Sequence, residues 1–160
     1  MKELQAVLFC LNGIKCGVQT EQVQEIVQYQ EVESIGEMPK CIDGVINLRG
    51  NNIPVINLNK RFKSGEAAIT KKTKIIVSNV NEMHVGFMVD EVSEIMKFHD
   101  EDISQPTEVL KKVSKDYISY IGKKNEEELF IILDLKKVLN EKEFKQLSLK
   151  KLGIVESEAS

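Results

Sequence analysis

Hydrophobic and polar residues alternate along much of the chain, in short runs separated by turn signals. Alternation over residues 6–11 and 14–18 predicts two strands, and Asn12-Gly13 between them is a strong signal for a two-residue hairpin. The same kind of pattern predicts further strands at residues 74–80, 84–89, 117–124 and 129–135. The chain is therefore expected to be mostly β.

Two segments predict short helices. Thr20 suits a helix N-cap, and three apolar residues follow it at helical spacing, namely Val23, Ile26 and Val27. This pattern leaves Glu25 on the more exposed side of a helix over residues 20–27. Near the other end of the chain, Asn140 and Glu143 have the spacing of a capping box, which predicts a second helix.

Residues 44–58 carry the most informative pattern, because they indicate two short strands joined by a tight turn. Ile46 and Leu48 share one face of the first strand, and residues 50–52 (Gly-Asn-Asn) tolerate the positive φ that a turn needs. Pro54 has no N–H, so the second strand is expected to lie at a sheet edge or to be bulged there.

Arg49 stands out on the polar face of this predicted hairpin. The chain has 22 lysines and arginines together, but Arg49 and Arg61 are its only arginines. A planar guanidinium can bind a carboxylate with a geometry that lysine does not provide, which favours a contact with a partner. The alternative is an ordinary solvated strand residue, since charged side chains are mostly exposed.

Four stretches in a fixed order resemble the CheW-like chemotaxis coupling proteins. In chain order they are residues 23–26 (VQEI), residues 39–50 (PKCIDGVINLRG) with 53–58 (IPVINL), residues 85–95 (VGFMVDEVSEI) and residues 129–135 (LFIILDL). Two positions depart from the family pattern, Asn52 in place of an apolar residue and Asn57 in place of aspartate. The resemblance implies an all-β fold with short helices, built as two SH3-like five-stranded β-barrel subdomains.

The resemblance also implies a function without catalysis. Such a protein links the cytoplasmic tips of chemoreceptors (methyl-accepting chemotaxis proteins) to the regulatory domain of the histidine kinase CheA, in the cytoplasm at membrane receptor arrays. The receptor tip, a helical hairpin, would dock in the groove between the barrels, and the kinase would bind barrel against barrel. The positions that match the family's partner-binding residues are Val23, Glu25, Gly44, Arg49, Gly50, Val92 and Ile95.

Simpler explanations exist for several of these positions. Val92 and Ile95 could be plain core residues, and Gly44 and Gly50 could serve backbone geometry alone. Arg49 and Glu25 are predicted to form a charge pair, because the resemblance places them close together.

An internal repeat suggests that the chain duplicates a small β unit. Residues 17–26 match residues 86–95 at a constant offset, and residues 55–58 match residues 132–135. Chance similarity between β hairpins is the alternative. We expect one domain over residues 1–155, with subdomains at about 5–70 and 71–150, chain ends that cross between them, and a disordered tail at 156–160.

Composition narrows the function further. A net charge of −3 and the absence of tryptophan count against single-strand nucleic-acid binders, and no apolar run reaches the ~20 residues of a membrane span. No signal peptide is visible at the polar start of the chain. The three cysteines cannot form a closed disulfide set, so they are expected to be free thiols in a reducing cytoplasm.

No catalytic or cofactor-binding constellation is recognisable. His84 and His99 have no nucleophile partner in a known motif, and residues 99–102 (HDED) indicate a solvated loop rather than a metal site. No cofactor and no metal are expected. A β-barrel that binds a small ligand or single-stranded nucleic acid is the alternative to the adaptor.

Overall fold

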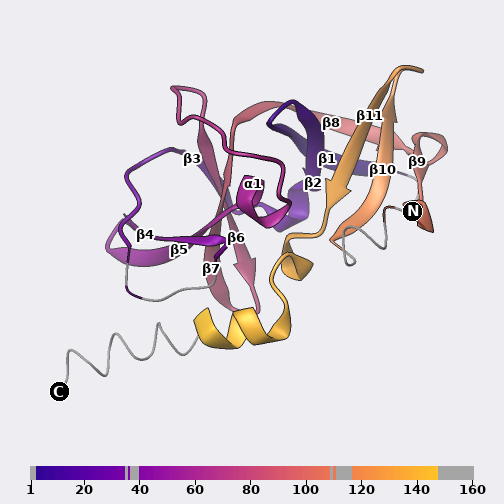
Figure 1. Ribbon diagram of the computed structural model, residues 1–160. Coiled ribbons are helices and arrows are strands. Elements are labelled where there is room, and N and C mark those ends of the chain that lie inside the picture. The colour runs from indigo at the N-terminus through magenta and orange to yellow at the C-terminus, as the bar shows by residue number, and fades with distance from the viewer. Residues whose placement is uncertain (1–2, 35, 37–39, 109, 111–116, 148–160) are drawn as a thin grey trace.

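Two β-sheets with a few short helices make up the computed structural model (Figure 1), which describes residues 3–34, 36, 40–108, 110 and 117–147. One sheet has six strands in the order β8-β1-β2-β11-β10-β9, and the other has five in the order β3-β6-β7-β5-β4. The expected all-β fold with short helices is confirmed.

The six-stranded sheet contains β1 (Glu3–Leu11), β2 (Ile14–Gln19), β8 (Glu91–His99), β9 (Ile103–Ser104), β10 (Ile118–Lys124) and β11 (Glu128–Leu133). The five-stranded sheet contains β3 (Glu25–Gln28), β4 (Ile42–Leu48), β5 (Asn51–Asn57), β6 (Lys74–Val80) and β7 (Met83–Val89). Short helices in the described part of the chain include η1 (Thr20–Gln22), α1 (Leu58–Arg61), η2 (Asp100–Asp102), η3 (Leu135–Lys137) and residues 141–147.

The sheets do not follow the order of the chain. The N-terminal hairpin β1–β2 pairs with β8 and β11, which come from the second half of the chain. Strands β3, β4 and β5 of the first half share a sheet with β6 and β7. Strand pairing therefore runs across the boundary expected near residue 70. Residues 156–160, where a disordered tail is expected, lie outside the described residues.

The internal repeat reappears as equivalent pairing in the two sheets. Gly17 of β2 lies opposite Ile132 of β11, and Gly86 of β7 lies opposite Val55 of β5, each in a parallel pair. These are the residues that the repeat aligns with one another. An added Cβ would lie 2.8 Å from an Ile132 side-chain atom at Gly17, and 2.7 Å from Ile75 at Gly86.

The largest core cluster joins the two sheets. It includes Phe9 of β1, Phe87 of β7 and Leu133 of β11, together with Val138 beyond η3. Two smaller clusters lie within single sheets, one around Phe98 and the other around Ile46, Val55 and Ile75. Burial of apolar surface thus holds the two units together as well as each unit separately.

The helix predicted over residues 20–27 is wrong beyond its first turn. Only η1 is helical, and residues 25–28 form β3, which pairs with β6 from Glu25↔Val77 to Gln28↔Lys74. Thr20 is not the N-cap; Gln19 occupies that position without a side-chain cap bond. Pairing with a strand far along the chain overrides the local helical spacing.

The central hairpin forms with its turn one residue earlier than expected. Arg49 and Gly50 form the turn, and residues 51–57 are strand β5. Leu58 begins α1 instead of ending a strand, because the Asn57 side chain caps that helix by accepting from the Lys60 N–H.

Pro54 lies neither at an edge nor at a bulge. β5 runs between β4 and β7, and the bulge in the hairpin falls between Ile42 and Gly44. The sheet tolerates Pro54 because the opposite residue, Val45, directs its N–H and C=O to Glu33 instead. Parallel pairing of β5 with β7 begins at the next residue, Val55.

Several local predictions are confirmed. Asn12 and Gly13 form the first hairpin turn with φ of 47° and 80°, and Cys10 and Cys16 pair with Lys15 and Phe9. All three cysteines are free. The capping box also forms, since Asn140 and Glu143 exchange hydrogen bonds of 2.7 and 3.0 Å.

Candidate partner-binding site

The predicted charge pair between Arg49 and Glu25 is present. The Arg49 Nη2 donates to the Glu25 Oε1, with the arginine side chain 68% and the glutamate side chain 33% exposed. Glu25 begins β3 and Arg49 follows β4, which are the two opposite edge strands of the five-stranded sheet. The ion pair therefore spans the opening between these edges, where the sheet curls round on itself.

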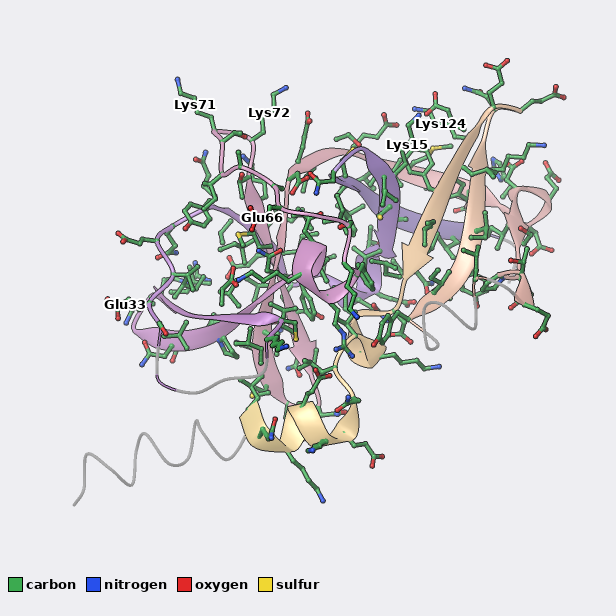
Figure 2. All side chains as sticks on the ribbon, in the orientation of Figure 1. Lys15, Glu33, Glu66, Lys71, Lys72 and Lys124 are labelled. Carbon is green, nitrogen blue, oxygen red and sulfur yellow. The ribbon has the colours of Figure 1, made fainter. Side chains whose placement is uncertain are left out.

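A short backbone contact closes the same sheet beside the ion pair. Glu33, on the segment after β3, exchanges two hydrogen bonds of 2.8 Å with Val45 of β4. Figure 2 shows Glu33 at the outer side of this sheet, beside β4. The segment after β3 thus links one edge of the sheet to the other, which gives it the closure expected of a barrel.

Gly44 serves this closure directly. Its φ is +146°, and a Cβ there would lie 2.0 Å from the Glu33 carbonyl oxygen. A side chain at position 44 would push Glu33 away from β4. The explanation by backbone geometry therefore accounts for Gly44.

Gly50 has a different environment. Its φ is +87°, but a Cβ would meet nothing within 4 Å, so only the turn conformation requires glycine. The Gly50 N–H donates to the Asn47 side chain at 3.0 Å, and Arg49 before it has φ of 51°. Positive φ at both residues is what a two-residue hairpin turn needs.

The three apolar candidates divide into two kinds. Val23 and Val92 are partly buried and pack against the largest core cluster. Ile95 is 59% exposed on β8, an edge strand of the six-stranded sheet. The plain-core explanation therefore does not account for Ile95, because its side chain faces solvent.

Sequence reasoning gave no role to the second arginine. Arg61 of α1 donates to Glu143 at 2.9 Å with only 14% of its side chain exposed, and its guanidinium lies over the Tyr117 ring, 4.9 Å from the centroid. This pair joins α1 to the helix of residues 141–147. Because both partners are largely buried, Arg61 is bound within the molecule in a way that Arg49 is not.

The thiols are poorly suited to nucleophilic chemistry. Burial raises the pKa of Cys16 to about 12 and that of Cys41 to about 11, and burial followed by the nearby Glu91 and Asp90 raises the pKa of Cys10. Because their pKa values are raised, these groups remain protonated at neutral pH. The thiolate is the reactive form, so they are poor nucleophiles. Among the described residues no cluster of His, Cys, Asp and Glu could hold a metal ion.

Comparison with known proteins identifies the family. The CheW-like domain family matches residues 5–143. The chain belongs to the CheW-like family. It is 30% identical over 151 residues to the chemotaxis protein CheW of Treponema pallidum, covering 92% of this chain and 88% of the relative. It is 34% identical over 134 residues to the CheW of Bacillus subtilis, covering 84% and 85%.

A solved structure supports the same assignment. The crystal structure of the scaffolding protein TtCheW from Thermoanaerobacter tengcongensis superposes with a TM-score of 0.80 at 30% identity, covering 89% of this chain and 96% of that one. The resemblance drawn from the sequence motifs is confirmed. This CheW-like chain is a non-enzymatic scaffolding and coupling protein of chemotaxis. None of the helices in the described part of the chain is long and apolar enough to cross a membrane.

Proposed function

We propose that this chain couples the cytoplasmic tips of chemoreceptors to the histidine kinase CheA, in the cytoplasm at receptor arrays. The receptor tip contacts the Arg49–Glu25 pair on the five-stranded sheet and Ile95 on the six-stranded sheet. The kinase binds through its own CheW-like regulatory domain. Support comes from the chemotaxis coupling relatives and from the chemistry of the Arg49–Glu25 pair.

The Arg49–Glu25 pair carries the proposal, because its features are hard to explain by folding alone. Arg49 holds a left-handed backbone that favours glycine or asparagine, yet its side chain remains 68% exposed. An exposed ion pair stabilises a fold by only ~0–1 kcal/mol. Strained backbone that gains so little stability is typical of functional sites.

At an interface the same pair acquires a larger effect. A docked partner removes water from both charges, so that loss of either one leaves the other buried and unpaired. The binding free energy then weakens by ~2–5 kcal/mol. Ile95 adds an exposed apolar side chain, against which the apolar face of an amphipathic partner helix can pack. A helical receptor tip fits this combination of one charge pair and one apolar contact.

The test is a reconstituted array of receptor signalling fragments, CheA and this protein, measured by co-sedimentation and kinase activity. Arg49→Ala should weaken coupling at least tenfold, equivalent to about 1.4 kcal/mol. Its melting temperature should remain within a few degrees of wild type, since surface changes are usually within about ±0.5 kcal/mol. Co-sedimentation without CheA assigns the loss to the receptor contact.

Lys15→Ala is the matched control. Lys15 forms an exposed ion pair with Glu128 at 3.1 Å and lies by the β10–β11 hairpin (Figure 2), so the variant removes a comparable pair elsewhere. Unchanged kinase activation by the Arg49→Ala variant would reject the functional role. A large fall in its melting temperature would show instead that the pair is structural.

A further inference from the structure

Asp90 is the single residue between β7 of the five-stranded sheet and β8 of the six-stranded sheet. Its carboxylate accepts one hydrogen bond from each side. Oδ2 accepts from the Asn12 backbone N–H at 2.6 Å, in the β1–β2 turn, and Oδ1 accepts from the Asn59 side chain at 2.7 Å, in α1. Its own N–H donates to the Cys10 carbonyl at 3.1 Å. Asp90 therefore bonds to both units at the point where the chain crosses between them.

The remaining bonds close these contacts into a ring. The Asn12 side chain donates to the carbonyl oxygens of Ser64 at 2.8 Å and Glu66 at 3.2 Å, on the segment between α1 and β6. The Ser64 hydroxyl donates to the Asn59 side-chain oxygen at 2.7 Å. Figure 2 shows Glu66 on this segment, above α1. Asn59 is only 4% exposed, so its bonds lie largely out of water.

The ring supplies something that the shared core does not. Apolar burial is non-directional, so the shared core defines the relative rotation of the sheets less sharply than hydrogen bonds do. Hydrogen bonds require defined distances and angles, and those to a carboxylate are stronger than neutral ones. A ring that ties the β1–β2 turn to α1 through one carboxylate restricts rotation of the sheets about the β7–β8 crossing.

We infer that Asp90 is a positioning residue that fixes the orientation of the six-stranded sheet relative to the five-stranded sheet. The consequence for docking rests on the proposed function. Ile95 lies on β8, five residues after Asp90, and the Arg49–Glu25 pair lies on the other sheet. A partner that contacts both therefore depends on the angle that Asp90 sets.

Residual dipolar couplings of backbone amides, measured for the whole chain in solution, test this orientation. In the wild type, one alignment tensor should fit the amides of both sheets. In Asp90→Ala, each sheet should still fit a tensor of its own, but the two tensors should differ, because the sheets then move relative to one another. In Asp90→Asn, one tensor should suffice, because an amide can accept from Asn12 and donate to Asn59 once the Asn59 amide turns over, with the Ser64 hydroxyl accepting.

Glu91→Ala is the matched control, because it removes the neighbouring carboxylate, whose ion pair among the described residues is a long, exposed one with Lys72 at 3.7 Å. It should behave as the wild type. A single tensor for both sheets in Asp90→Ala would overturn the inference. If Asp90→Ala does not fold, Asn59→Ala decides by the same criterion, because it removes the bond from α1 to the Asp90 carboxylate and the bond from Ser64, and leaves Asp90 itself in place.

The array assay then separates this inference from the proposed function. Coupling should fall about tenfold in Asp90→Ala and recover in Asp90→Asn, within the range seen when a residue outside the contact alters binding. Separate tensors with unchanged coupling would support the positioning role and count against the proposed contact surface. Reduced coupling with a single tensor would overturn the positioning role and leave the proposed function standing.

Discussion

The β1–β2 and β4–β5 hairpins share the same turn and differ in the residue that begins it. Asn12 and Gly13 have φ of 47° and 80°, and Arg49 and Gly50 have φ of 51° and 87°. Asparagine tolerates this left-handed conformation because its short side chain bonds locally, whereas arginine does not. The first turn thus follows local preference and the second departs from it.

The contacts of the two turns explain the difference. Asn12 bonds through its backbone and side chain to Asp90, Ser64 and Glu66 of the same chain. Arg49 directs a mostly exposed guanidinium to a single carboxylate, Glu25. One turn is therefore used for internal order, and the other presents a charged group at the surface. Four variants make this comparison quantitative.

Gly44→Ala should have the largest effect, because it acts at the base of the β4–β5 hairpin. The new Cβ would lie 2.0 Å from the Glu33 carbonyl at a φ of +146°, so either the Glu33–Val45 bonds or the strand must move. The free energy of unfolding should fall by about 3 kcal/mol or more, as expected for steric strain at a special backbone conformation. Urea denaturation followed by circular dichroism measures this.

Gly50→Ala is its control at the tip of the same hairpin. The φ there is also positive, but a Cβ meets nothing within 4 Å, so the cost should be about 1–2 kcal/mol. Equal losses in the two variants would show that conformation alone matters. The close approach to Glu33 would then be no explanation for Gly44.

Asn12→Arg places the residue of the second turn in the first. It should cost about 2 kcal/mol in the same denaturation experiment, from the less favourable turn conformation and the two lost side-chain bonds to Ser64 and Glu66. A loss below about 0.5 kcal/mol would contradict the view that this turn is used for internal order. Lys15→Ala in the neighbouring strand serves as a surface reference.

The sequence predicted those elements whose signals are local. The Asn12-Gly13 turn, the strand at residues 74–80 and the Asn140–Glu143 capping box all follow from residues within a few positions of one another. The Arg49–Glu25 pair was also found, but from the family resemblance rather than from local pattern. Arg49 at a turn position could not be predicted, because arginine is disfavoured there.

Pairing between distant strands accounts for the failures. The spacing of Val23, Ile26 and Val27 fits a helix locally, but β3 gains its partner from β6, about fifty residues along the chain. The internal repeat argues against a helix in this segment. It aligns residues 20–26 with residues 89–95, most of which are the strand β8, so consistency between the two halves favoured a strand. The Asp90 ring had no sequence signal, since its members come from four separate segments.

Arg49→Asn should give the smallest effect on stability, between a loss of about 0.5 and a gain of about 1 kcal/mol. Asparagine suits the left-handed position that arginine occupies, which should add about 0.5–1 kcal/mol, less the ~0–1 kcal/mol of the exposed pair with Glu25. For a chain of this size, each kcal/mol corresponds to about 2–4 °C in melting temperature. The melting temperature should therefore lie between about 2 °C below and about 4 °C above that of the wild type, while coupling in the reconstituted array falls at least tenfold. Opposite signs for stability and coupling would show that the second turn keeps a residue its own backbone disfavours because a partner binds it. A clear fall in melting temperature would mean that the ion pair matters more to the fold than the turn conformation does, and the two hairpins would then differ less than their contacts indicate.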